Sequence, residues 1–183
     1  AMSRISFCAM AVAAIALLSG CATGIPDGVK AVDNFDAGRY LGTWHEIARL
    51  DHSFERGLSN VSATYSARED GGIKVINRGY DKAKGKWRQV EGRAYFIDGR
   101  DQGRLKVSFF RPFYGAYNIV ALDKDGYGYA LVCGPDRSYL WILARARSLN
   151  KATLDSLVAK ARGLGFDTEA LIYVSQDGIP EGK

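Results

Sequence analysis

The side chains that most often carry enzymatic chemistry are scarce in this sequence of 183 residues. His45 and His52 are its only histidines, and neither belongs to an HExxH pattern that would place two metal ligands on one helix face. Cys133 could act as a nucleophile, but it ends the apolar run Ala-Leu-Val-Cys, where burial in a strand favours an inert thiol. The Gly-x-Ser-x-Gly motif and Gly-rich phosphate loops are also absent from the sequence. We therefore expect a protein that is not an enzyme, with no catalytic residues, no metal site and no cofactor.

Cys21 has a different chemistry because of the sequence that precedes it. After a basic residue, an apolar stretch runs over 7–18, and the small residues at 19–20 stand directly before the cysteine. This order resembles a bacterial lipobox, in which a signal peptide is removed and the new N-terminal cysteine is acylated. The stretch is shorter than the ~20 residues of a bilayer span, and a secretory signal with a chance cysteine is the alternative. We expect a lipoprotein signal peptide over 1–20 and lipid attachment at Cys21.

Acylation of this cysteine would set the location of the protein, because several acyl chains hold a protein on a membrane far better than one. As the lipobox resemblance implies, Ala22 after the cysteine favours the bacterial outer membrane, with the protein facing the periplasm. Cleavage would also remove Cys8, so that Cys133 has no partner within the chain and no internal disulfide is expected. The segment 21–36 lacks sustained periodicity, which predicts a lipidated N-terminus and tether.

The formal net charge of +5 does not point to a nucleic-acid partner. The charged residues are spread over short mixed clusters at expected turns, and no block of like charge forms a basic arm. A solvated surface explains this basicity, and a nearby anionic membrane surface is the alternative. We therefore expect no nucleic-acid binding.

Residues 37–176 have the pattern of a single all-β domain that could position a binding site. Short runs rich in β-branched and aromatic residues alternate with turn signals such as Asp-Gly and Gly-Pro. Regular hairpins in sequence order favour an antiparallel up-and-down barrel, and a sandwich with longer crossovers is the alternative. We expect eight strands, at 40–50, 61–67, 73–81, 87–97, 104–110, 116–123, 127–133 and 138–145.

The period changes after the last of these runs. Asn150 can cap a helix whose apolar residues recur at 154, 157, 158 and 161, with a glycine near its end. A single apolar stripe means that this helix packs against another surface, most simply the outside of the barrel. We also expect a short extra strand over 171–174 and a C-terminal tail over 177–183.

These motifs resemble those of the lipocalin family, especially its bacterial outer-membrane lipoprotein branch. The resemblance covers about 35–174 and rests on RYLGTWHEIARL, SFERGL, VSATYS, DGGIKVINRGYD, LKVSFFRPFYGAYNIVALD, YALVCGPDRSYLWILARAR and GFD. Gly42-x-Trp44 matches the first-strand signature of the family, and Arg145 matches the arginine that packs over this tryptophan. At 124–126 only the aspartate of the family's Thr-Asp-Tyr is present. These three signature residues are expected to plug one end of the barrel and to leave the other end as a mouth.

Several expected strands are apolar on both faces, and a barrel of about eight strands is either filled by side chains or holds one small ligand. Periodicity leaves both alternatives open, and the resemblance favours a cavity. Extending the inward face of Trp44 and Arg145 by side-chain alternation and by the resemblance gives the expected ligand-binding set. It comprises Ala63, Tyr65, Val75, Val107, Phe109, Tyr117, Ile119, Val132, Tyr139 and Trp141. The loop 51–60 could close the mouth as a lid, or be a plain surface loop.

The resemblance and the lipobox together imply a membrane-anchored protein that reversibly binds fatty acids or lysophospholipids in the barrel, for storage or transport at the cell envelope. An apolar slot near Tyr hydroxyls suits an acyl chain with its polar head at the mouth. The first alternative is an envelope scaffold with a filled barrel that binds a partner protein, and the second is a lipid-modifying enzyme. A homodimer could form through a strand edge near 87–97 or through an apolar mouth, but nothing in the sequence requires it.

Overall fold

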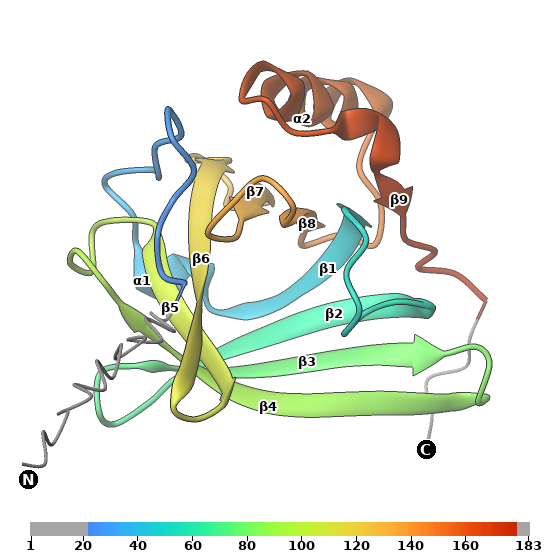
Figure 1. The fold of residues 1–183 in the computed structure, drawn as a ribbon, viewed down its shortest axis with the longest axis horizontal. Coiled ribbons are helices and arrows are strands. Elements are labelled where there is room, and N and C mark those ends of the chain that lie inside the picture. Colours follow the sequence, from blue (N-terminus) through green and yellow to red (C-terminus); the bar gives the residue numbers. More distant parts are fainter. Residues whose placement is uncertain (1–21, 179–183) are drawn as a thin grey trace, which may run out of the picture.

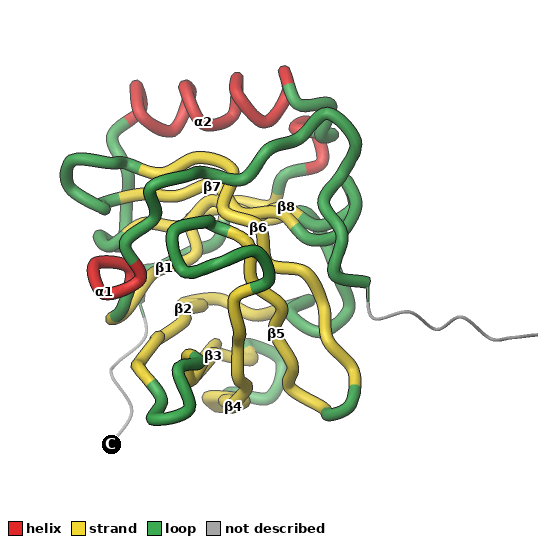
Figure 2. The backbone as a smooth tube through the Cα atoms, turned by 90° about the vertical axis from the view of Figure 1, so that its left-hand side faces the viewer, coloured by secondary structure: helices red, strands yellow, loops and turns green. Residues whose placement is uncertain are grey.

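The computed structural model describes residues 22–178, and these form one closed antiparallel barrel with a helix beside it (Figures 1 and 2). Neighbouring strands pair in sequence order, and β1 pairs with both β8 and β2, which closes the sheet. The expected eight-stranded up-and-down barrel is therefore confirmed. The strands are β1 (Gly42–Arg49), β2 (Leu58–Ala67), β3 (Ile73–Asp81), β4 (Lys86–Phe96), β5 (Arg104–Phe110), β6 (Phe113–Leu122), β7 (Tyr129–Cys133) and β8 (Leu140–Ala144).

Helix α2 (Lys151–Gly163) lies against the outside of the barrel, over β7 and β8 (Figures 1 and 2). The Asn150 side chain accepts a hydrogen bond from the Thr153 N–H at 2.8 Å and caps the first turn. Leu157 and Ala161 are buried against outward-facing residues of β7 and β8, in an apolar layer that also contains Cys133. The expected helix outside the barrel is confirmed. Among residues 22–178, no helix is long and apolar enough to cross a membrane.

Three short elements complete the fold. α1 (Ala37–Tyr40) precedes β1, and its first turn is capped by the Asp36 carboxylate, which accepts bonds from two backbone N–H groups. The strand expected from residue 40 therefore begins only at Gly42. After α2, the 3-10 helix η1 (Thr168–Ala170) leads into β9 (Ile172–Tyr173), which pairs with the end of β1.

The segment 22–36, expected as a tether, lies on the barrel instead. Val32 exchanges backbone hydrogen bonds with the strand region beside it, donating to Ile119 O at 2.9 Å and accepting from Gly103 N at 2.8 Å. Val29 and Phe35 are buried in the two apolar clusters of the protein. The apolar residues at 29, 32 and 35 give this segment enough surface to bury, so it packs rather than extends. The expected signal peptide over 1–20 and the expected lipid attachment at Cys21 lie outside the described residues.

Candidate functional site

One end of the barrel is closed by Trp44 and Arg145. The Trp44 side chain is fully buried, and its indole Nε1 donates to Tyr40 O at 2.8 Å. The guanidinium carbon of Arg145 lies 4.1 Å from the centre of the indole ring, within the range of a cation–π contact. The same guanidinium donates to Arg39 O at 2.7 Å and to Thr43 O at 3.2 Å, which ties α1 and the start of β1 to the end of β8.

Gly42 makes room for this contact. Its φ of 99° lies in a region that other residues rarely adopt, and a Cβ at this position would come within 3.1 Å of Arg145 Nη1. The structure thus brings the three residues Gly42, Trp44 and Arg145 together at the end where the sequence places a plug. The cavity lies inside the barrel, between this closed end and the opposite end.

The inner part of the cavity is a mainly apolar chamber of about 110 Å³ inside the barrel. Tyr40, Ile73, Ala94, Leu105 and Leu143 line it together with residues of the expected set. Seven of the ten expected residues are among its walls, namely Ala63, Tyr65, Val75, Val107, Phe109, Tyr117 and Trp141. Side-chain alternation, extended by the resemblance, therefore places most of the expected residues on this wall.

The three other expected residues lie elsewhere. Ile119 and Val132 face each other across β6 and β7, fully buried in the same cluster as Trp44, where they belong to the packed core and not to the wall of either chamber. Tyr139 lines only the outer part of the cavity. Alternation fixes whether a side chain points inward, but not at which depth along the barrel the packed core gives way to open space. The expectation for Ile119 and Val132 is corrected accordingly.

Three tyrosine hydroxyls gather in the inner chamber. The Tyr117 hydroxyl lies 2.7 Å from that of Tyr40 and 2.9 Å from that of Tyr65, so it joins all three in one hydrogen-bonded chain. Burial raises the pKa of each of these phenols above its usual value, so they stay protonated at neutral pH. The chamber therefore contains neutral hydrogen-bonding groups among apolar walls.

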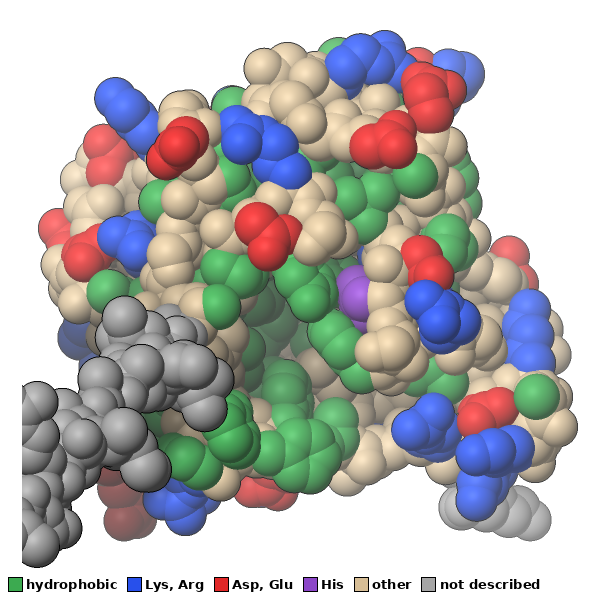
Figure 3. Space-filling model, in the orientation of Figure 1, with side chains coloured by type: hydrophobic (Ala, Val, Ile, Leu, Met, Phe, Trp, Pro, Cys, Tyr) green, Lys and Arg blue, Asp and Glu red, His purple; other side chains and the backbone are tan. Residues whose placement is uncertain are grey.

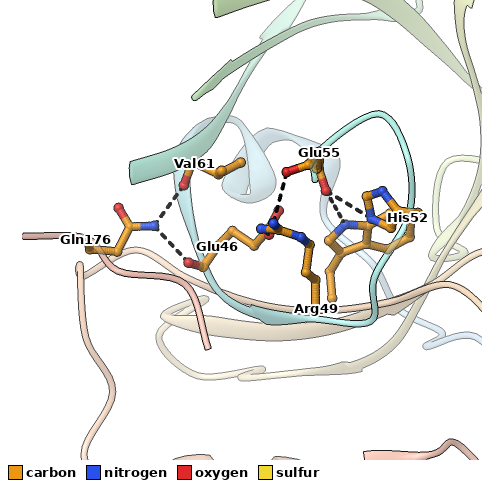
Figure 4. A network of polar contacts seen from close by, with 7 residues as sticks. Glu46, Arg49, His52, Glu55, Val61 and Gln176 are labelled. Atoms are coloured by element: carbon orange, nitrogen blue, oxygen red, sulfur yellow. Dashed lines mark hydrogen bonds and ion pairs between the residues drawn. The ribbon is translucent and has the colours of Figure 1, made fainter. Parts of the chain in front are cut away.

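A bulge in β1 adds charged groups to the same interior. The pairing with β8 shifts between Glu46 and Ala48, so that Glu46 and Arg49 both come to the inner face, opposite Leu143 and Trp141. Arg49 Nη1 lies 2.7 Å from Glu46 Oε1, and both side chains are buried. Figure 4 shows these two side chains beside the loop that follows β1. The C-terminal segment also contacts this strand, because Gln176 Nε2 donates to Glu46 O at 2.8 Å.

The loop after β1 contributes a second carboxylate to this network. Glu55 Oε2 lies 3.0 Å from His52 Nε2 and accepts from Trp141 Nε1 at 3.1 Å, while Arg49 Nη2 donates to the Glu55 backbone oxygen at 2.9 Å (Figure 4). Burial alone would raise the pKa of Glu55, but His52, Trp141 and Arg49 hold it below its usual value. Burial and the nearby Glu55 carboxylate raise the pKa of Glu46 well above its usual value, despite Arg49.

Both carboxylates line the inner chamber, and the sequence reasoning missed them. Glu46 had a signal, because it stands two residues after the inward-facing Trp44 on the same strand face. Glu55 had none, because a loop residue belongs to no periodic pattern. The loop that carries Glu55 packs into the barrel, since the side chains of Glu55 and His52 are both buried.

The outer part of the cavity is a chamber of about 590 Å³ that opens to the surface. It shares wall residues such as Val107 and Trp141 with the inner chamber, so one leads into the other. Its rim carries Phe54, Phe110 and Phe113, which are 55%, 77% and 70% exposed. Figure 3 shows a hollow edged by hydrophobic side chains on this face of the molecule.

Cys133, the candidate nucleophile of the sequence, does not line the cavity. Cys133 is a free, buried thiol on the outer side of β7, and burial raises its pKa to about 12. Among residues 22–178, no cluster of three or more His, Cys, Asp or Glu side chains could hold a metal ion.

The sequence and the fold are similar to those of known proteins. The model of the lipocalin-like domain family matches residues 35–176. The chain is 53% identical over 160 residues to "Outer membrane lipoprotein Blc" of Vibrio cholerae, covering 87% of this chain and 93% of the relative. It is 51% identical over 177 residues to the protein of the same name from Escherichia coli K12, covering 97% and 99%.

More distant proteins share the fold. "Temperature-induced lipocalin-1" of Arabidopsis thaliana is 35% identical over 161 residues, which is 83% of this chain and 85% of the relative. The solved structure of insecticyanin from the tobacco hornworm superposes with a TM-score of 0.67 at 23% identity, covering 86% of this chain and 88% of that one. At that identity, the likeness to insecticyanin bears on the fold alone.

Proposed function

The chain belongs to the lipocalin family, and from this membership and its cavity we propose that it reversibly binds fatty acids or lysophospholipids inside the barrel, for storage or transport at the cell envelope. It is a binding protein and not an enzyme, as its family and its Blc relatives are. Relatives that are 51–53% identical are named outer membrane lipoproteins, and the chain is accordingly a lipid-anchored protein of the outer membrane. Cys21 is the residue we propose for the anchor.

The observation that carries this proposal is a continuous, mainly apolar cavity that is closed at the Trp44–Arg145 end and open at the other. The inner chamber of about 110 Å³ is much smaller than the outer one. The tip of an acyl chain would therefore occupy it, with the rest of the chain in the outer chamber of about 590 Å³. A filled-barrel scaffold would leave no such space.

The affinity should be moderate. Burying ~14 methylenes at ~0.8 kcal/mol each gives a gross gain of roughly 11 kcal/mol, and association costs of ~4–15 kcal/mol offset much of it. Polar contacts supply orientation. Asn77 lines both chambers, and its Oδ1 has no hydrogen-bond partner within the described residues, so it can accept a bond from a ligand hydroxyl or ammonium group.

Displacement of a fluorescent fatty acid from the purified protein tests the proposal. We expect saturable binding at about one ligand per barrel, with competition by unlabelled fatty acid and lysophospholipid. Ala94→Phe places a ring in the inner chamber and should weaken binding by at least about tenfold, since overpacked sites cannot readily adapt. Ala159→Phe, on the exposed face of α2, is the matched control and should bind normally. Equal binding by both variants, or no saturable binding by the unaltered protein, would contradict the proposal.

A further inference from the structure

The rim of the outer chamber exposes aromatic side chains that a water-facing surface would not need. Phe110 and Phe113 pair with each other at the end of the β5–β6 hairpin and are 77% and 70% exposed. Phe54, on the loop after β1, completes the rim at 55% exposed. Concentrations of exposed apolar surface around a hollow mark sites of contact with another molecule or with a membrane. A ligand bound inside the barrel does not account for these exposed rings at its rim.

The described chain begins at the same rim. Ala22 lines the outer chamber and forms a parallel bridge with Gly115, and Ala116 N donates to Ala22 O at 2.8 Å. Gly115 stands two residues after Phe113, so the start of the described chain lies next to the exposed hairpin. Cys21, the proposed anchor residue, immediately precedes Ala22 in the sequence.

The residues that follow Ala22 are held in place. Arg104 Nη2 donates to Thr23 O at 3.2 Å, and the buried Asn118 Nδ2 donates to Gly24 O at 3.0 Å. A lipid-anchored protein with a long free tether could present any face to the membrane. Here residues 22–24 are bonded to β5 and β6, so an anchor directly before them would bring the aromatic rim to the membrane surface.

The basic side chains around the rim would also favour contact with a membrane surface. Arg111 is exposed between the two hairpin phenylalanines, and Arg78 and Arg88 line the outer chamber from β3 and β4. Basic side chains near a membrane attract its anionic headgroups. Two acidic residues also line this chamber: Glu55 lies 3.0 Å from His52, and Asp136 Oδ1 accepts from Ser138 N at 2.8 Å. The three arginines outnumber them.

We propose that the mouth of the barrel rests on the lipid bilayer that holds the anchor, with the rings of Phe54, Phe110 and Phe113 in the headgroup region. A lipid then enters the outer chamber directly from the leaflet, without crossing water. This inference rests on the proposed function for its purpose, but the orientation can be measured without any ligand in the barrel.

Depth-dependent quenching in vesicles tests the orientation. The full-length lipidated protein, extracted from its membrane, is reconstituted into vesicles of phosphatidylethanolamine and phosphatidylglycerol that contain lipids brominated on the acyl chain. The variant Phe110→Trp adds an indole at the rim, and Ala159→Trp adds one on the exposed face of α2 as the matched control. Phe113→Trp is a second rim variant in case the first does not fold.

We expect the emission added at the rim to fall by roughly half, because interfacial side chains reach ~5–10 Å into the headgroup and acyl boundary, while the emission added on α2 is unchanged. Equal quenching of the rim and α2 positions, or none at either, overturns the proposal. A rim indole that is shielded from brominated lipid while the protein migrates as a dimer also overturns it and assigns the rim to a second copy of the chain. Loss of fatty-acid displacement with normal rim quenching would refute the proposed function and leave this orientation intact.

Discussion

Trp44 and Trp87 each stand two positions after a glycine, yet their surroundings differ. Trp44 is fully buried between Tyr40 and the Arg145 guanidinium. Trp87 is partly exposed on β4, where it packs edge-on against Tyr80 at 5.5 Å and under the guanidinium of Arg78 at 3.9 Å. The same three-letter pattern therefore serves as a plug in one place and as a surface contact in the other.

Truncation of each ring measures this difference. Trp44→Ala should lower the free energy of unfolding by about 3–5 kcal/mol, because it leaves a large buried cavity and removes the cover of the barrel end. Trp87→Ala, its matched control, should cost much less because its ring is partly exposed. Urea unfolding followed by circular dichroism gives both values, and equal losses would refute the distinction.

Glu46 makes stability depend on pH. Its pKa is raised well above the usual 4.5, so the folded protein holds a proton that the unfolded chain releases. At pH values below the unfolded pKa both states are protonated and this group contributes no penalty. As pH rises from about 4.5 through the raised pKa, ionisation favours the unfolded state, and stability is lost across that window.

The substitution Glu46→Gln removes this titration. Because glutamine cannot ionise, the stability of the variant relative to the unaltered protein should increase with pH above about 4.5 and level off beyond the raised pKa. Urea unfolding at a series of pH values measures the difference. Glu91→Gln is the control, because Glu91 is 58% exposed in its pair with Lys74. A pH-independent difference for Glu46→Gln would contradict the assignment.

For single residues, the sequence predicts whether a side chain points into the barrel better than it predicts how far along the barrel the side chain lies. It identifies the inward face that carries Tyr65, Val107 and Trp141, since alternation is a property of every strand. It does not separate the chamber wall from the packed core at Ile119, because that boundary depends on how neighbouring side chains fill the barrel. Nor does it indicate that Glu55 is folded into the interior by contacts to His52 and Trp141.

At the scale of elements, turns and caps account for what the sequence predicts well. Asp-Gly and similar turn signals bound the strands to within about three residues, and Asn150 marks the start of α2. The bulge in β1 was not predicted. It places both Ile47 and Ala48 in the apolar cluster that includes residues of α2, while Glu46 and Arg49 turn inward. The packed segment 22–36 was missed because its apolar residues are too sparse to form a recognisable strand or helix.

The cap of α2 can be tested by itself. Asn150→Ala removes the acceptor for the Thr153 N–H and should lower the free energy of unfolding by about 1 kcal/mol, the usual effect of losing such a cap. Ser156→Ala, on the exposed middle of the same helix, should cost nothing. Thermal unfolding of both variants measures the effect. An unchanged midpoint for Asn150→Ala would show that the cap does not stabilise the helix.

At the scale of the whole molecule, the two ends of the barrel have opposite characters. Arg145 and Trp44 seal one end, and the outer chamber opens at the other, beside the point where the described chain begins. The barrel pattern predicts the closed fold, which is confirmed, and the lipobox predicts an anchor at Cys21, which lies outside the described residues. The size and division of the cavity could not be predicted, because volume is what remains after all side chains have packed.

Native mass spectrometry of the protein extracted from its own membrane detects the anchor and a bound lipid in one measurement. We expect a species that carries the acyl groups of its anchor and, in addition, one non-covalently bound fatty acid or lysophospholipid, which collisional activation releases. In the Ala94→Phe variant the anchor should remain and the bound lipid should be lost. An unaltered protein that carries its anchor but no lipid, even after incubation with excess fatty acid and lysophospholipid, would contradict lipid binding in the barrel.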